Sequence, residues 1–326
     1  MKKELVQVLS YFLIFDYPPS LDEIYTFFPK RISKNKLSKE LSKIVFKNKS
    51  IEPYSNLRFT IDRSKNRVVE YSIKTVKSEE LRVRSYEERY QSSLKKIDKV
   101  RFYIRLLSFF PQIKLIGLSG GVAMLNAEEN DDIDIFIITA KHRLWTGRLI
   151  AVLLAQILGI RRSRLLDGKK LVIKDKICLN LFFDETNLKV SKRKQTVYVG
   201  HEILQMKLFV NKDMIYERFL DANRWIMKFF PNSNILRASL RFGGESRSIS
   251  YCNNRSRQAR TVIRSFKSII PNIIGNISES IMKKIQLWLI KKHQANEIIT
   301  NNQLWFFPED FEKKIRARLI DQSPEK

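Results

Sequence analysis

The chain has 326 residues, of which 44% are hydrophobic and 11% aromatic, and 61 lysines and arginines against 34 acidic residues give a formal net charge of +27. The apolar content excludes a disordered chain, and the length allows roughly two or three domains. The charge favours a polyanionic partner, such as nucleic acid, a nucleotide or an anionic membrane face. Two cysteines, Cys178 and Cys252, cannot build a disulfide framework, so we expect a reduced, cytoplasmic setting.

We expect neither a membrane span nor a signal peptide. The most apolar window, Leu149 to Ile160, covers 12 residues, whereas a helix needs about 20 to cross a bilayer. Arginines flank this window on both sides, which favours a buried core helix. Near the N-terminus, Glu4, Gln7 and Asp16 interrupt the apolar run, and no small-residue cleavage site follows.

Residues 1–76 combine helical and strand patterns. Apolar residues recur at helical spacing in three runs, and Ser20 forms a capping box with Glu23 at the start of the second run. Segments 50–61 and 66–73 then have the composition of strands. Three helices followed by a small β-wing resemble the winged helix-turn-helix domain.

This resemblance allows two interpretations of the N-terminal domain. The predicted third helix is rich in lysine, as a DNA-recognition helix would be, which makes a DNA-binding regulator one hypothesis. Winged helices also serve in protein contacts and packing, where lysines only solvate an exposed face. The lysines concerned are Lys34, Lys36, Lys39, Lys43 and Lys47.

The remaining chain divides into three predicted parts. Residues 77–112 form a connecting helix. Residues 113–198 alternate strands with helices, which marks an α/β unit. Residues 199–326 have helical apolar spacing and predict a helical C-terminal region. A basic stretch at 237–267 offers either a phosphate-binding surface or a solvated segment.

Three predictions apply to the C-terminal region. We expect helices over 201–210 and 214–230. We expect the tail, 303–319, to form a turn and a helix. We expect one apolar stripe at helical spacing to pack in the core, formed by Ile277, Ile281, Ile285 and Leu289.

An acidic run interrupts the apolar segment LIGLSGGVAMLNAEENDDIDIFIIT, residues 115–139. Asp132 and Asp134 are two residues apart at the start of a predicted strand, so their carboxylates lie on one face. Convergent carboxylates suit Mg²⁺, or Mn²⁺, which also binds substrate phosphates. Upstream, Gly120 and Gly121 let backbone N–H groups approach a phosphate.

This segment resembles the signature of nucleotidyltransferases related to DNA polymerase β. The usual pattern is Gly-Ser, an alanine, a glycine and then Ser-Asp-hydrophobic-Asp, and matches at that spacing occur at Gly120, Ala123, Asp132, Ile133 and Asp134. The chain departs from it in having Gly121, Leu125 and Asp131 where serine, glycine and serine are usual. The resemblance covers residues 114–185 and implies an α+β core with a small mixed sheet.

The resemblance also implies roles for individual residues. Asp132 and Asp134 would bind the metal and act in catalysis, and Ser119, Gly120 and Gly121 would bind the nucleotide. Many family members add a third carboxylate from the next strand. There, strand alternation puts Asn180 on the site face together with Cys178 and Phe182, and leaves Asp184 and Glu185 at the strand end as alternatives.

Other candidate side chains have weaker patterns. His142, His201 and His293 are scattered, so we expect surface or capping roles for them. Neither cysteine has metal-ligand spacing. Three basic residues flank the predicted site and offer phosphate contacts, namely Arg143, Arg148 and Lys174.

The expected activity is transfer of a nucleoside monophosphate from a nucleoside triphosphate to an acceptor hydroxyl, with Mg²⁺ and release of pyrophosphate. The acceptor is a small molecule, a protein side chain or an RNA end. One alternative is a nucleotide- or nucleic-acid-binding protein of the same fold that has lost catalysis. The other is the DNA-binding regulator described above.

Overall fold

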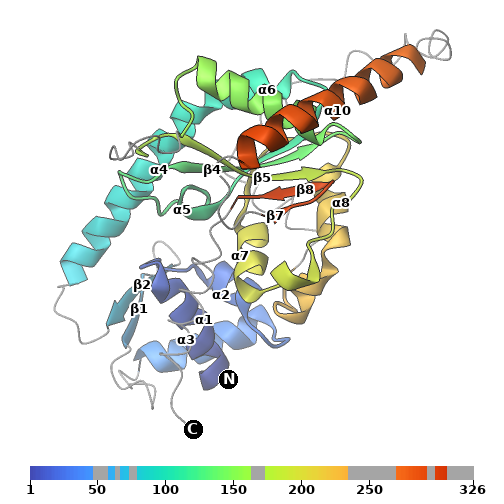
Figure 1. The fold of residues 1–326 in the computed structure, drawn as a ribbon. Helices are drawn as coiled ribbons and strands as arrows, with labels where there is room; N and C mark the ends of the chain where they lie inside the picture. The colour runs from blue at the N-terminus through green and yellow to red at the C-terminus, as the bar shows by residue number, and fades with distance from the viewer. Residues whose placement is uncertain are drawn as a thin grey trace, which may run out of the picture.

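The computed structural model describes residues 1–46, 58–62, 67–72, 79–162, 173–233, 269–291 and 298–306. These residues form a mixed α/β structure around a six-stranded sheet, with helices on both faces (Figure 1). The helices are α1 (Lys2–Ile14), α2 (Leu21–Phe27), α3 (Lys34–Phe46), α4 (Glu79–Ser108), α5 (Gly120–Ala123), α6 (Leu144–Ile157), α7 (Val197–Gln205), α8 (Ile215–Ala222) and α10 (Ile269–Lys291). The strands are β1 (Arg58–Asp62), β2 (Arg67–Ser72), β3 (Ile113–Leu118), β4 (Ile133–Thr139), β5 (Ile177–Asp184), β6 (Lys207–Asn211), β7 (Ile298–Ile299) and β8 (Gln303–Trp305).

The large sheet has the strand order β6-β3-β4-β5-β8-β7. Strands β4 and β5 pair in parallel, and the other neighbours pair antiparallel. The α/β class and the mixed sheet are therefore confirmed, together with the predicted strands of the central segment. Strands β1 and β2 form a separate antiparallel pair.

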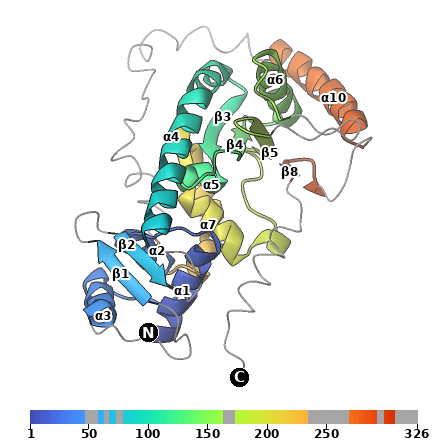
Figure 2. The ribbon, with the colours of Figure 1, turned by 90° about the vertical axis from the view of Figure 1, so that its left-hand side faces the viewer.

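The two faces of the large sheet carry separate hydrophobic clusters. On one face, Ile133, Ile135 and Ile137 pack with residues of α4, α6 and α10. On the other face, Phe136 and Ile138 pack with the N-terminal helices and with α7 and α8. Figure 2 shows the N-terminal helices beside α7, below the sheet. Alternation along β4 thus assigns every second residue to each cluster.

Helix α2 begins as its sequence predicts. The Ser20 hydroxyl accepts a hydrogen bond from the Glu23 N–H at 3.2 Å, and the Glu23 carboxylate accepts one from the Ser20 N–H at 2.7 Å. This capping box satisfies two N–H groups that a helix start leaves without partners. Ser33 similarly accepts from the Lys36 N–H at 3.3 Å.

The C-terminal region, predicted as helical, contains strands as well as helices. The helix predicted over 201–210 ends at Gln205, and β6 follows from Lys207, paired with β3. In the tail, where we expected a turn and a helix over 303–319, Gln303–Trp305 is strand β8. A run such as Lys207–Asn211 has apolar residues that fit either period, and pairing with β3 decides for the strand. The rest of the tail lies outside the described residues.

The apolar stripe of α10 is on a helix, as predicted, but it does not pack in the core. Its four members, Ile277, Ile281, Ile285 and Leu289, are between 47% and 56% exposed. The opposite face of α10 binds α6 through polar side chains. Gln286 donates to the Trp145 carbonyl at 2.7 Å, and Glu279 accepts from the Trp145 N–H at 2.6 Å. No helix of the described residues is both long enough and apolar enough to cross a bilayer.

Candidate functional site

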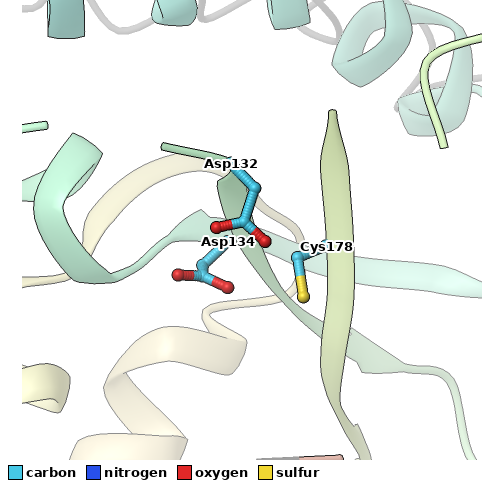
Figure 3. Close-up of side chains that lie close together, drawn as sticks. All are labelled: Asp132, Asp134 and Cys178. Carbon is cyan, nitrogen blue, oxygen red and sulfur yellow. The ribbon is translucent and has the colours of Figure 1, made fainter. Parts of the chain in front are cut away.

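Asp132 and Asp134 lie side by side at the start of β4. Ile133 and Ile135, which alternate with them, are buried on the α4 and α6 side of the sheet. The carboxylates consequently project from the opposite face. One ligand atom of each aspartate and the Cys178 sulfur lie within 4.8 Å of one another (Figure 3). The two acids therefore converge, as their spacing predicts.

Cys178 joins this cluster because β5 pairs in parallel with β4, which sets Cys178 opposite Asp134. Cys178 therefore lies on the site face, as strand alternation predicts. It has no metal-ligand spacing along the chain, and pairing between strands brings it to the aspartates. Burial, followed by the charges of Asp134 and Asp132, raises the pKa of the Cys178 thiol far above its ordinary value. A protonated thiol is a poor ligand for a hard cation, so the aspartates are the better ligands.

Asn180 also faces the aspartates. Its Nδ2 donates to Asp134 Oδ1 at 2.6 Å. The register of β4 and β5 shifts between Asp134 and Phe136, so Phe136 lies opposite Leu181, and Phe182 lies opposite Ile137. The prediction that Phe182 shares the site face is wrong, because this irregularity reverses the alternation beyond Asn180.

Asp184 and Glu185 have backbone partners at the end of β5. Asp184 accepts hydrogen bonds from the N–H groups of Arg143 and Thr186, at 3.2 and 2.9 Å. Glu185 accepts from the Lys141 N–H at 2.8 Å. These contacts give both carboxylates a structural role at the strand end, away from Asp132 and Asp134.

A third carboxylate reaches the site from a different element. Glu202 of α7 accepts a hydrogen bond from the Gly120 N–H at 3.1 Å. Glu202 follows Gly120 by 82 positions, and nothing in the HEIL segment of the sequence marks it as a site residue. It enters the site because α7 packs under the sheet beside the glycine turn.

Neighbouring charges and burial shift the acids of the site. Arg162 pairs with Asp132 at 2.5 Å. Burial, then Asp132 and Glu202, raises the pKa of Asp134 to about 8. Burial also raises the pKa of Glu202, to about 7. Because Asp132 and Glu202 both raise the pKa of Asp134, an additional cation would stabilise the charged forms of these carboxylates.

Two buried oxygen atoms in the site have no hydrogen-bond partner among the residues that the structure describes. They are Oγ of Ser119 and Oδ1 of Asn180, and their residues are only 7% and 4% exposed. Buried polar atoms normally have partners, so such atoms at a cavity wall point to a ligand. Together with the aspartate oxygens they form an oxygen-rich donor set, which suits Mg²⁺ or Mn²⁺.

These groups line one cavity of about 930 Å³, large enough for a nucleotide together with a second molecule. Asp132, Asp134 and Glu202 form part of its polar wall, and much of the remainder is apolar, including Leu181, Val199 and Ile203. The N-terminal helices contribute to its wall through the turn after α1, with Ile14, Phe15 and Asp16.

Arg89 of α4 ties this turn to the rest of the site. It donates to the Asp16 carbonyl at 2.7 Å and to Asn126 Oδ1 at 2.8 Å. Asn126 in turn donates to the Phe15 carbonyl at 2.8 Å. These bonds join residues from three parts of the sequence at the cavity wall.

The other basic candidates have varied positions. Arg148 lines the cavity and donates to Gln286 at 2.6 Å. Arg143 instead bonds Asn276 of α10 at 3.0 Å, and Lys174 pairs with the exposed Glu129. Arg162 flanks the apolar helix in the sequence, and its guanidinium contacts Asp132.

The histidines differ from the prediction in one case. His142 is exposed, as expected, but His201 is only 2% exposed and lies in the core. It stacks between aromatic rings of the N-terminal helices, which a search for metal-ligand spacing cannot reveal. His293 and Cys252 lie outside the described side chains.

Comparisons of the chain with protein-family models, with curated proteins and with solved structures find no match. A proposal about the function therefore depends on the residues of the site alone.

Proposed function

We propose that the protein is a Mg²⁺-dependent nucleotidyltransferase, in which the central sheet is the nucleotidyltransferase core and the N-terminal elements are a winged helix-turn-helix domain. The reaction is transfer of a nucleoside monophosphate from a nucleoside triphosphate to an acceptor hydroxyl. The observation that carries the proposal is the convergence of Asp132 and Asp134 beside the glycine turn, next to the unpartnered oxygens of Ser119 and Asn180.

Different groups of the site have different roles in the proposed reaction. Asp132 and Asp134 hold the cation, which, when bound, neutralises phosphate charge and helps align the reacting oxygens. The backbone at Gly120 and Gly121 donates to phosphate oxygens, and Arg162 adds a guanidinium at the same end of the cavity. The apolar walls exclude water and leave room for the base and for the body of the acceptor.

The test is mass-detected or radiolabelled transfer from each of the four ribonucleoside triphosphates with Mg²⁺, first to the protein itself and then to pools of small hydroxyl compounds and RNA. Transfer in the parent that is lost in Asp132→Asn, Asp134→Asn supports the proposal. Asp98→Asn is the control, because Asp98 is an exposed acid that pairs with Arg101. Equal transfer by the double variant would assign the activity to another site or to a contaminant.

A nucleotide-binding protein without catalysis is the second candidate. The observation that favours it is the amide of Asn180 bonded to Asp134, where many nucleotidyltransferases that the segment resembles place an acid that can accept a proton. Calorimetry separates the two candidates. This second protein binds a nucleotide with Mg²⁺, and its binding is lost in the Asp132→Asn, Asp134→Asn variant, while the transfer assay gives no product.

A further inference from the structure

Gly120 lies between two carboxylates of the site. Its N–H donates to Glu202 Oε2 at 3.1 Å. Its φ is +64°, and a Cβ at this position would lie 2.9 Å from Asp134 Oδ2. The absence of a side chain at Gly120 therefore lets Asp134 and Glu202 approach the same residue from two directions.

The Gly120 N–H is also a donor that the proposed function assigns to a phosphate oxygen. Glu202 and a phosphate are both anions, and one N–H group cannot bind both in good geometry. A triphosphate that binds at the glycine turn must therefore displace the Glu202 carboxylate. The protein's own carboxylate occupies the place of the substrate anion.

A displaced Glu202 needs a new partner, because a buried carboxylate without one is costly. The guanidinium of Arg162 is already paired with Asp132. The Tyr198 side chain bonds Glu202, but it supplies no positive charge. A cation brought in with the triphosphate supplies such a partner, within the same cavity that Glu202 lines.

We propose that Glu202 is the third carboxylate of the site, and that it exchanges the Gly120 N–H for the nucleotide-bound cation. This inference rests on the proposed function. Glu202, which lies on helix α7, thereby supplies the third negative charge, which Asn180 cannot supply because its amide is uncharged. Before the exchange, the Gly120 N–H donates to the Glu202 carboxylate. After the exchange, the Gly120 N–H donates to a phosphate oxygen and the Glu202 carboxylate binds the cation.

The exchange is a side-chain rotation and leaves α7 in place. His201, the neighbouring residue, is stacked between Tyr11 and Phe27 with ring centroids 3.6 and 3.9 Å away. Such packing fixes the helix backbone. Glu202 has three side-chain torsions, which is enough to move its carboxylate from one partner to another.

The experiment is calorimetry with the full chain, comparing the parent with Glu202→Gln. The ligands are Mn²⁺ alone, and Mn²⁺ with the α,β-methylene analogue of ATP, GTP, CTP or UTP. In these analogues a carbon replaces the oxygen between the α- and β-phosphorus atoms, where transfer would break a bond. Glutamine retains an oxygen acceptor for the Gly120 N–H, so the unliganded site keeps its geometry. Glu185→Gln is the matched control, because Glu185 has a backbone partner away from the cavity. Thermal melting checks the folding of both variants.

The expected result is a difference that depends on the nucleotide. Glu202→Gln binds Mn²⁺ alone like the parent, but binds Mn²⁺ about ten-fold or more weakly with the analogue present, the scale on which loss of a metal-supporting side chain is felt. The control matches the parent in both titrations. Equal Mn²⁺ affinities with the analogue would overturn the role of Glu202 while leaving the proposed function standing. A parent that binds none of the analogues would overturn the proposed function itself.

Discussion

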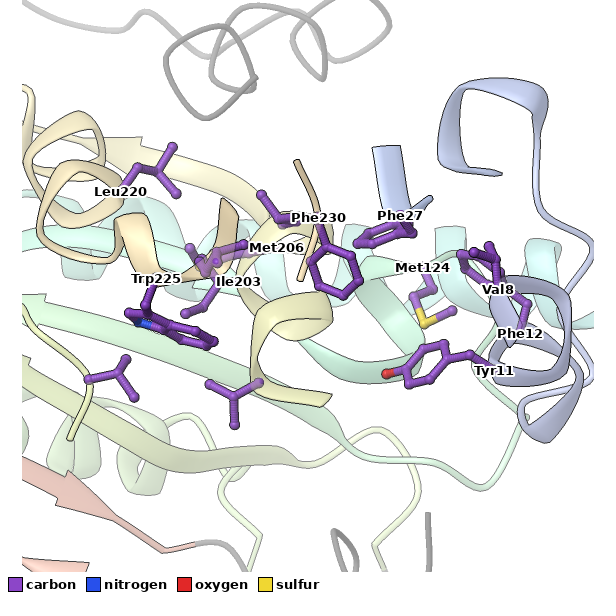
Figure 4. Packing of buried hydrophobic residues seen from close by; sticks show 14 of the residues in the cluster. Val8, Tyr11, Phe12, Phe27, Met124, Ile203, Met206, Leu220, Trp225 and Phe230 are labelled. Atoms are coloured by element: carbon purple, nitrogen blue, oxygen red, sulfur yellow. The ribbon is translucent and has the colours of Figure 1, made fainter. Parts of the chain in front are cut away.

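The imidazole of His201 lies flat against the phenol ring of Tyr11, with ring centroids 3.6 Å apart and planes inclined by 14°. Phe27 stacks on the other side at 3.9 Å, and Phe230 meets the imidazole edge-on at 4.8 Å. Figure 4 shows Tyr11, Phe27 and Phe230 gathered in this core. The stack joins α1 and α2 to the helix that carries Glu202. The N-terminal helices are thus part of the framework of the candidate site.

Two substitutions of His201 separate the contribution of its ring packing to stability from the contribution of its protonation. His201→Phe keeps a stacked ring and should fold as stably as the parent at pH 7.5. His201→Ala leaves a cavity and should lower the free energy of unfolding by about 3 kcal/mol. Urea denaturation measures both. An alanine variant as stable as the parent would show that the stack contributes nothing to the joined core.

The same pair of variants predicts a pH dependence. Burial lowers the pKa of His201 well below its ordinary value of 6.5, so the folded protein keeps the imidazole neutral while the unfolded chain binds a proton below pH 6.5. The unfolded state then binds more protons, and stability falls as the pH falls, by at most about 1.4 kcal/mol per pH unit. His201→Phe should lose less stability than the parent between pH 7 and pH 5. Parallel losses would contradict a neutral buried His201.

Lys96 and Lys99 offer a matched pair that tests the support of the acidic turn. Both contact Asp175, but the Lys96 side chain is 2% exposed and that of Lys99 is 58% exposed. Lys96 also donates to the carbonyls of Glu129 and Asp131 at 2.9 and 2.7 Å. It therefore holds the backbone next to Asp132 as well as pairing with Asp175.

Lys96→Met should lower the free energy of unfolding by about 3 to 5 kcal/mol, because it leaves buried acceptors without a donor. Lys99→Met should lower it by less than about 1 kcal/mol, as expected of an exposed pair. Chemical denaturation of both variants in the same buffer gives the comparison. Similar losses would mean that burial of Lys96 does not decide the contribution.

Local patterns predicted those parts of the site that lie within one segment. Asp132 and Asp134 converge because alternation within a single strand fixes their faces. The capping box at Ser20 likewise depends on residues three apart. The fold class followed from the order of predicted strands and helices, which survives errors in the bounds of single elements.

The missed parts depend on contacts between distant segments. The irregularity in the pairing of β4 with β5 decides where Phe182 points. Glu202 and His201 depend on how α7 packs against the glycine turn and against α1 and α2. Neither pairing register nor helix packing leaves a periodic signal at these residues, so sequence patterns could not place them.

Asp134→Asn should stabilise the unliganded protein at alkaline pH. The pKa of Asp134 in the folded protein is raised to about 8 from an ordinary 3.8, so between these values the unfolded chain releases the proton more readily. Stability therefore falls as the pH rises from about 4 to about 8. Without divalent cations, the variant should melt higher than the parent at pH 8.5, with a smaller difference at pH 5. A constant difference at all pH values would contradict the raised pKa.

Gly120 and Gly159 distinguish backbone strain from an effect on the site. Both have a left-handed backbone, with φ of +64° and +66°. A Cβ at Gly159 would meet no atom of the described residues within 4 Å, whereas one at Gly120 would lie 2.9 Å from Asp134 Oδ2. Strain alone costs about 1 to 2 kcal/mol for alanine in this conformation. Gly159→Ala should therefore lose only that stability and bind Mn²⁺ like the parent. Gly120→Ala should lose more, because its methyl group also displaces Asp134, and should bind Mn²⁺ at least about ten-fold more weakly. Melting and Mn²⁺ calorimetry on both variants check this. If Gly120→Ala resembled Gly159→Ala in both measurements, the close approach of Gly120 to Asp134 would have no part in holding the cation.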